Sequence, residues 1–226
     1  IKGFMDRYTN PTKIIPEADK RSLDHKMCSS YTDGTKLCVE MSVLANAING
    51  RTDIPGMHGP KVAHALDLFR HYDLDAMWMQ KDRVPVVDYL LGAEPKGGVF
   101  VVGYTENEFQ QYTLEWFPPS MGPGPYYLFY RPYHLGHIEA MDCVAEAYLQ
   151  GTARLQPSFG MRTNVFTYAK KDLRAGDVLD GMGGYQCYGL IENLDDFTDE
   201  PGLPVCISDN LKLKRNIAKD ARISLD

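Results

Sequence analysis

The sequence predicts an α+β fold, in which helices cover one face of a mixed or mainly antiparallel sheet and a small β-rich module follows. Stretches with the spacing of one helix face alternate irregularly with runs of strand-forming residues. From residue 165 onward the predicted units are short and separated by turns. We therefore expect one domain at residues 1–164 and a β-rich domain at residues 165–226, with the boundary in the poorly patterned linker 152–164.

The first 50 residues predict two helices and a short strand. One helix is expected near residues 17–26. The turn signal Asp33-Gly34 precedes a short strand at 36–39, and apolar residues then recur with helical spacing over 40–49. Gly50 is expected to end this helix, because glycine readily adopts the left-handed conformation found just after a last turn.

Residues 53–61, DIPGMHGPK, form a constrained loop that holds His58 between Met57 and Gly59. Two glycines and two prolines restrict its backbone to an irregular path. Pro60 suits the first turn of a helix, which we expect to run to about residue 72. Such a loop can present His58 to a functional site, or it can be a rigid connector whose histidine caps a carbonyl.

The middle of the chain predicts most of the sheet. The segment GGVFVVGY, residues 97–104, is a continuous apolar run that suggests a central strand covered on both faces. Residues 106–117 contain strand-forming residues and are expected to continue the sheet. The loop at 118–125 is rich in proline and glycine and leads into an aromatic strand that begins at Tyr126.

Residues 126–149 predict a strand, a turn and a helix, and the turn carries four candidate functional residues. Arg131, Tyr133, His134 and His137 lie where the helix begins, and free amides and the helix dipole there favour a negative group. An arginine adds bidentate recognition of a carboxylate or phosphate, and a histidine can donate a hydrogen bond or move a proton. The structural alternative is an Arg131 paired with an acidic neighbour and a satisfied His134.

The composition disfavours several classes of protein. Twenty-four basic and 30 acidic residues give a net charge of -6, which argues against a broad nucleic-acid surface. No apolar run approaches the length of a membrane span, so we expect a soluble, cytoplasmic protein with no membrane partner. The cysteines are odd in number and lack the spacing of a disulfide framework or a zinc site. A start at Ile1 and the lack of a glycine-rich phosphate loop suggest part of a longer protein.

The end of the chain resembles a SAF domain, a small β-clip module. The motifs are AKKDLRAGDVLDGMGG at residues 169–184 and LPVCISDNLKLKRNIAKDARI at residues 203–223, which look like the two halves of such a domain. The resemblance covers most of residues 165–226. SAF domains occur in proteins of several functions, so this module alone is a weak guide to function. Its simplest role is to cover an apolar face or help subunits associate.

Four motifs upstream resemble, in order, the C-terminal part of a family of NAD(P)-dependent oxidoreductases related to homoserine dehydrogenase and including 1-deoxy-D-xylulose 5-phosphate reductoisomerase-like enzymes. They are DGTKLCVEMSVLANAING (33–50), IPGMHGPK (54–61), GGVFVV (97–102) and GPYYLFYRPYHL (124–135). Family members carry an N-terminal Rossmann domain before this region, and no matching residues occur in this sequence. The resemblance therefore implies that NADPH or NADH binds mainly to that missing domain.

The resemblance implies a substrate site built from both unusual loops. The catalytic candidates are His58, Tyr133 and His134. The substrate-binding candidates are Asn46, Gly56, Met57, Arg131 and His137. A reductoisomerase also implies Mn or Mg; Glu40 is a conceivable ligand, but the sequence shows no carboxylate cluster and assigns no metal or cofactor ligands.

We therefore expect this chain to be the substrate-binding portion of an NAD(P)H-dependent oxidoreductase and to be inactive alone. The whole enzyme is expected to act as a homodimer on a small phosphorylated or carboxylated polyol-like compound. The specific candidate is conversion of 1-deoxy-D-xylulose 5-phosphate to 2-C-methyl-D-erythritol 4-phosphate, a step of isoprenoid biosynthesis. One alternative is a homoserine dehydrogenase-like oxidoreductase of another small hydroxy acid. Another is a non-catalytic, SAF-type sugar-binding protein.

Overall fold

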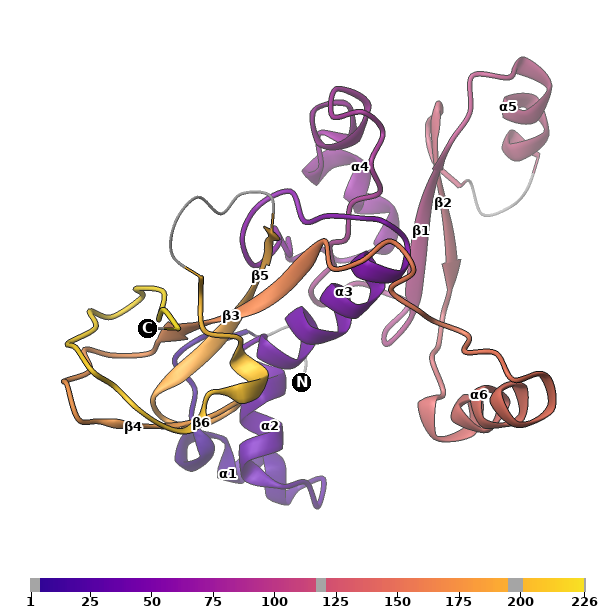
Figure 1. Ribbon diagram of the computed structural model, residues 1–226. Helices are drawn as coiled ribbons and strands as arrows, with labels where there is room; N and C mark the ends of the chain where they lie inside the picture. Colours follow the sequence, from indigo (N-terminus) through magenta and orange to yellow (C-terminus); the bar gives the residue numbers. More distant parts are fainter. Residues whose placement is uncertain (1–4, 117–120, 195–200, 226) are drawn as a thin grey trace. The chain divides into compact units, whose positions relative to one another are not determined.

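The computed structural model describes residues 5–116, 121–194 and 201–225 (Figure 1). Helices are combined with small antiparallel sheets, so the predicted α+β class is confirmed. The helices are α1 (Pro11–Asp19), α2 (His25–Thr32), α3 (Thr35–Ala47), η1 (Ala65–Asp67), α4 (Leu68–His71), η2 (Asp75–Met79), α5 (Glu108–Glu115), α6 (Gly136–Gln150) and η4 (Val205–Ile207). The strands are β1 (Val99–Tyr104), β2 (Tyr126–Arg131), β3 (Thr163–Ala169), β4 (Val178–Asp180), β5 (Cys187–Asn193) and β6 (Asp209–Lys212). None of the described helices combines the length and apolar character that crossing a bilayer requires.

The chain folds into two compact units. The first unit consists of Ile1–Gly59, Gln80–Tyr89 and Leu155–Asp226, and the second consists of Pro60–Met79 and Leu90–Arg154. The first unit thus combines the N-terminal helices with the C-terminal strands. The predicted domains at 1–164 and 165–226 rest on sequence composition and resemblance, and they stay a prediction.

In the first unit, α3 packs against the antiparallel pair β3 and β5. Val165 of β3 lies opposite Ile191 of β5, and both are buried in one core cluster with Cys38 of α3. The amide of Gly189 in β5 donates a hydrogen bond to Thr35 Oγ1 at 2.8 Å, which fixes the start of the helix on the strand. This core supports the loop that follows α3.

A second core in the same unit holds the C-terminal strands and turns together. β4 pairs antiparallel with β6, and the predicted strands at 165–169 and 178–179 are confirmed as parts of β3 and β4. The buried residues of this core are all aliphatic: Ala169, Leu173, Leu179, Leu203, Leu213, Ile217 and Ile223. The predicted turn-rich β structure of this region is therefore present.

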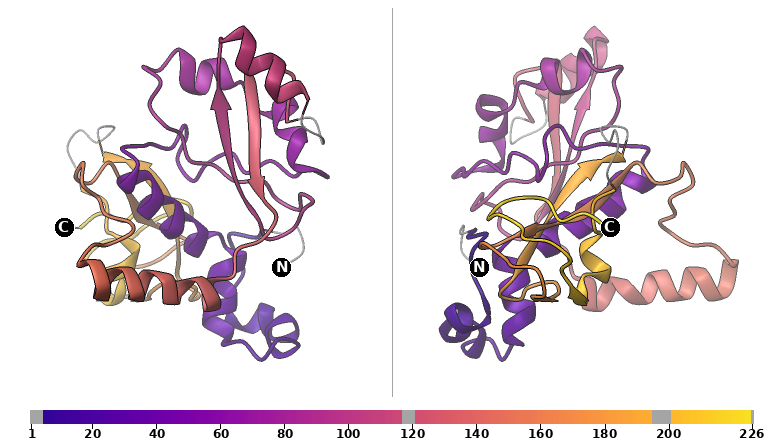
Figure 2. Two further views of the ribbon diagram at one scale, coloured as in Figure 1. Left: turned by 90° about the vertical axis from the view of Figure 1, so that its right-hand side faces the viewer. Right: turned by 60° about the vertical axis from the view of Figure 1, so that its left-hand side comes forward.

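The second unit contains the antiparallel pair β1 and β2, which lie side by side in Figure 2. Phe100 and Val102 pack against a cluster that contains Leu68 of α4. Their neighbours on the opposite face of β1, Val99 and Val101, are 52% and 68% exposed. The expectation of a central strand covered on both faces is therefore wrong: in the described residues β1 pairs with one strand only.

The predicted strand at residues 36–39 is also wrong, because the helix expected at 40–49 begins earlier. Gly34 adopts φ +84°, a left-handed conformation that turns the chain after α2. Asp33 Oδ1 then accepts a hydrogen bond from the Thr35 amide at 2.9 Å. This bond satisfies one of the free amides that begin a helix, so α3 starts at Thr35.

Residues 106–117 contain the helix α5 rather than the predicted strand. Asn107 Oδ1 accepts a hydrogen bond from the Gln110 amide at 3.0 Å, which is a helix N-cap. Thr113, a β-branched residue typical of strands, donates its hydroxyl to the Phe109 carbonyl at 2.8 Å within the same helix. The cap therefore decides the structure of this segment against side-chain propensity.

Two predicted helices differ from the structure in length. The helix expected over 60–72 begins only at Ala65, because Lys61 and His64 form parallel bridges with Leu91 and Glu94. The helix expected near 17–26 is divided, since α1 ends at Asp19 and α2 begins at His25. In the second case Asp24 caps the new helix by accepting from the Met27 amide at 2.8 Å.

Candidate functional site

The predicted strand, turn and helix at 126–149 are confirmed, and the turn ties Arg131 to the start of α6. Arg131, the last residue of β2, forms an ion pair with Glu139. Its guanidinium carbon also lies 4.5 Å from the centroid of the Tyr133 ring. Glu139 in turn accepts a hydrogen bond from the Leu135 amide at 3.0 Å, so one carboxylate both caps the helix and neutralises the arginine.

The two histidines of this turn differ in their contacts. His134 Nδ1 lies 2.6 Å from the carbonyl oxygen of Gly97, and it must carry the proton because a carbonyl only accepts. His137 lies in the first turn of α6 and is exposed. The pairing of Arg131 and the satisfied His134 are the contacts that the structural alternative expects. Their roles in substrate binding and catalysis stay predictions.

The loop with His58 is held against β5 by its backbone. The Gly56 amide donates to the Ile191 carbonyl at 2.9 Å, and a Cβ on Gly56 would lie 2.7 Å from Leu190 Cδ2. Met57 adopts φ +67° and is only 3% exposed, so its side chain belongs to the core. This close packing makes the loop a rigid support for His58.

Two aspartates hold His58 from different sides. Asp88 accepts hydrogen bonds from the backbone amides of His58 and Gly59 at 3.0 and 2.9 Å. Asp53 Oδ2 lies 2.9 Å from His58 Nε2. The other oxygen of Asp53 accepts a hydrogen bond from Lys81 Nζ at 2.7 Å. Asp88 therefore fixes the backbone of the loop, and Asp53 contacts the imidazole ring.

The Asp53 carboxylate lies among positive groups. Its side chain is 11% exposed, and Arg51 adds a guanidinium nitrogen at 3.6 Å. Burial alone would raise the pKa of Asp53, but hydrogen bonds and charges from Lys81 and His58 outweigh it and hold this pKa below its usual range. Asp53 is therefore ionised at neutral pH and accepts hydrogen bonds with both oxygens.

Asn46 has a structural role in the first unit. Its Oδ1 accepts hydrogen bonds from the amides of Arg162 and Thr163 at 2.7 and 2.9 Å. Its Nδ2 donates to the Thr163 carbonyl at 3.1 Å. The side chain thus fastens the end of α3 to the start of β3, and its predicted contact with substrate stays a prediction.

The candidate residues fall into two sets. Asn46, Gly56, Met57 and His58 belong to the first unit, and Arg131, Tyr133, His134 and His137 belong to the second. Sequence reasoning missed the residues that surround His58: Asp53, Lys81 and Asp88. Of these, only Asp53 had a local signal, because it opens the same glycine- and proline-rich loop.

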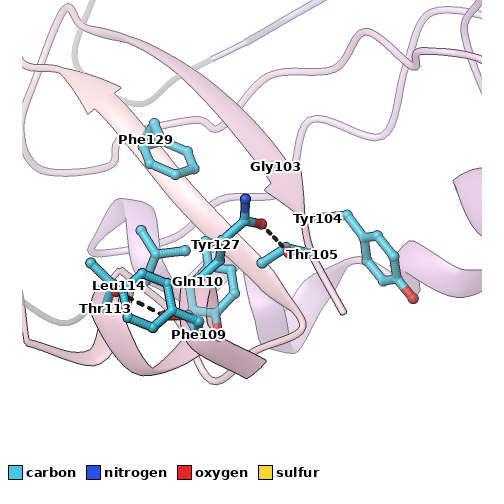
Figure 3. Close-up of a pocket in the computed structure, with 9 residues that line it drawn as sticks. All are labelled: Gly103, Tyr104, Thr105, Phe109, Gln110, Thr113, Leu114, Tyr127 and Phe129. Atoms are coloured by element: carbon cyan, nitrogen blue, oxygen red, sulfur yellow. Dashed lines mark hydrogen bonds between the residues drawn. The ribbon is translucent and has the colours of Figure 1, made fainter. Parts of the chain in front are cut away.

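An open cavity of about 390 Å³ lies in the second unit between α5 and the strand pair (Figure 3). Its walls are largely aromatic and aliphatic: Tyr104, Phe109, Leu114, Tyr127 and Phe129. A hydrogen bond from Thr105 Oγ1 to Gln110 Oε1, 2.5 Å long, lies at one side. Among the described residues that line this cavity none is charged, so it does not match the anion site that the sequence predicts.

A divalent metal does not fit the donors that the structure describes. Across residues 5–116, 121–194 and 201–225, no three His, Cys, Asp or Glu side chains gather in a set that could hold a metal ion. Glu40, the conceivable ligand, forms an ion pair with Lys36. The expected Mn or Mg thus stays an implication of the resemblance.

Comparison with known proteins assigns the larger part of the chain to a protein family. A family model described as "Oxidoreductase DRL, catalytic domain" matches residues 2–140. The match includes the His58 loop and the turn from Arg131 to His137. No curated protein matches the chain. The C-terminal strands lie outside the match, so their SAF assignment stays a prediction. The chain belongs to the family of oxidoreductases that share the DRL catalytic domain.

Proposed function

We propose that this chain is the substrate-binding portion of an NAD(P)H-dependent oxidoreductase that acts, as a homodimer, on a small phosphorylated or carboxylated polyol-like compound. The specific candidate reaction is the reductoisomerisation of 1-deoxy-D-xylulose 5-phosphate. NADPH or NADH, bound mainly by a Rossmann domain of the kind that relatives carry, would supply the hydride. The observation that carries the proposal is the rigid loop that holds His58 against an ionised aspartate, within the part of the chain that matches an oxidoreductase catalytic domain.

Reduction of a carbonyl compound needs a proton at the carbonyl oxygen as well as a hydride at carbon. A histidine side chain can move that proton, because its ring nitrogens both bind and release one. His58 suits this role because its backbone and ring are both held by hydrogen bonds, which fix the ring with respect to the loop. A positioned group of this kind reduces the reorganisation needed when the substrate binds.

The turn at Arg131 suits the anionic group of such a substrate. The side chains of Arg131 and Glu139 are 48% and 28% exposed, and an exposed ion pair of this kind contributes only about 0–1 kcal/mol. A phosphate or carboxylate can therefore replace Glu139 at the guanidinium with little loss. Tyr133, on whose ring the guanidinium stacks, would keep the arginine oriented during that exchange.

Arg131→Ala in the full-length gene product is expected to raise KM for the anionic substrate about tenfold to a hundredfold, because a charge-assisted contact is lost. The matched control is Arg154→Ala. Arg154 forms the same kind of exposed pair with Glu146 of α6, with side chains 52% and 23% exposed. Steady-state kinetics should leave this control near wild type. Unchanged kinetics of the Arg131 variant would remove the turn from the substrate site.

The substrate is tested with the same protein, with NADPH or NADH for reduction and NADP⁺ or NAD⁺ for oxidation, each with and without Mg²⁺ or Mn²⁺. The panel contains 1-deoxy-D-xylulose 5-phosphate, homoserine and other small hydroxy acids. Turnover of the deoxyxylulose compound supports the reductoisomerase reaction. Oxidation of another compound of the panel would support an oxidoreductase with a different substrate. No turnover, with binding of a neutral sugar, would favour the non-catalytic alternative. Sedimentation of the same sample tests the homodimer.

A further inference from the structure

The arrangement around Asp53 determines which nitrogen of His58 carries a proton. Each oxygen of this carboxylate has its own donor: Lys81 Nζ at 2.7 Å on Oδ1, and His58 Nε2 at 2.9 Å on Oδ2. An ionised carboxylate only accepts hydrogen bonds. Nε2 must therefore donate, and in the neutral ring the proton resides there rather than on Nδ1.

The backbone of the loop is fixed without Asp53. Asp88 holds the amides of His58 and Gly59, and the Gly56 amide donates to the Ile191 carbonyl. Substitution at Asp53 should consequently leave the backbone of the loop in place and change the contacts of the His58 ring, Lys81 and Arg51. The effect of Asp53 on the His58 ring can therefore be measured without loss of the loop's backbone contacts.

We propose that Asp53 is a positioning residue that holds His58 in the tautomer with its proton on Nε2, so that Nδ1 is the basic nitrogen of the neutral ring. Lys81 supports this role because it occupies the other oxygen of the carboxylate. The catalytic consequence rests on the proposed function of His58, whereas the tautomer itself does not. Long-range ¹⁵N–¹H spectra of the chain, at a pH where the ring is neutral, distinguish the two tautomers.

Asp53→Asn is expected to reverse the tautomer. Lys81 can only donate, so it will keep the amide oxygen of the new side chain on its own side. The amide nitrogen then faces His58 Nε2 and donates to it. Nε2 becomes an acceptor and the proton moves to Nδ1. Arg51 faces the same oxygen at 3.6 Å. When Lys81→Met and Arg51→Met are both added to Asp53→Asn, neither cation orients the amide, so both tautomers should appear.

The chain offers a matched control in a second His–Asp pair. His25 Nε2 lies 2.7 Å from Asp19 Oδ1, but this pair is more exposed, with side chains 42% and 63% accessible. Asp19→Asn should leave the His58 signals unchanged, and Asp53→Asn should leave the His25 signals unchanged. A change in both histidines would indicate a general structural effect and would overturn the assignment to Asp53.

The wild-type spectrum alone can also overturn the proposal. A neutral His58 with its proton on Nδ1 would contradict it, whether or not any variant folds. In the full-length gene product, Asp53→Asn should lower kcat on the order of tenfold to a hundredfold with little change in KM, because the basic nitrogen has moved. If the tautomer reverses but kcat is unchanged, Asp53 still positions the ring and the proposed catalytic role of His58 fails instead.

Discussion

Replacement of Lys170 by methionine is expected to lower the free energy of unfolding by about 3–5 kcal/mol, because it leaves a charge buried without its partner. Lys170 Nζ lies 2.9 Å from Asp33 Oδ2, and the two side chains are 3% and 0% exposed. The same ammonium donates hydrogen bonds at 2.7 Å to the carbonyls of Thr9 and Gly184. One side chain thus joins the N-terminal segment, the turn before α3 and the C-terminal strands.

The loss of stability in the Lys170→Met variant should depend on pH. Burial raises the pKa of Asp33, and the charge of Lys170 opposes that shift. Without the ammonium the pKa rises further, so the folded variant binds a proton more readily than its unfolded chain does. Its stability therefore falls as the pH rises from the unfolded toward the folded pKa, and acid should restore part of the loss. Urea unfolding followed by circular dichroism at several pH values measures this.

Lys171→Met is the matched control, because Lys171 is the next residue and is exposed. Its midpoint in urea should stay close to wild type. The double variant Asp33→Asn with Lys170→Met should be more stable near neutral pH than Lys170→Met alone, since no unpaired charge remains. Equal midpoints for the two lysine variants would show that the buried pair contributes nothing to stability.

The sequence predicts best the elements whose signals are local. Aromatic strand formers change to helical spacing around Pro132 and Gly136, and the structure has β2, a turn and α6 in those places. Helix starts were predicted less well, because a single cap can outweigh the propensity of several residues. Asn107 caps α5 in a segment that contains Thr113 and Trp116, both typical of strands.

The surroundings of His58 could be predicted only in part. The loop around it is constrained by glycines and prolines within a few residues, and this constraint is visible in the sequence. Lys81, by contrast, lies 28 positions after its partner Asp53, and Asp88 lies 30 positions after His58. No periodicity or spacing encodes such contacts, because they depend on how α3, the loop and Gln80–Tyr89 pack in one unit.

Gly59→Ala is expected to destabilise the first unit by about 2–4 kcal/mol and to disturb the loop at His58. Gly59 adopts φ +54°, where a side chain strains the backbone. An added Cβ would also overlap the end of the Tyr89 ring. Tyr89 is half-buried and donates its hydroxyl to Met5 Sδ at 3.2 Å, so displacing the ring breaks a further contact.

Gly97→Ala separates the two contributions, because Gly97 adopts φ +69° but a Cβ there would meet no atom within 4 Å. This control should lose only about 1–2 kcal/mol of backbone strain. Adding Tyr89→Ala to Gly59→Ala removes the overlap, so the double variant should lose less free energy of unfolding than the sum of the two single losses. Urea unfolding of the wild type, both single variants and the double variant measures these losses, and the NMR signal of the His58 amide shows whether the loop is disturbed. Additive costs would mean that the ring moves aside freely, and the loop would then be less rigid than its packing indicates.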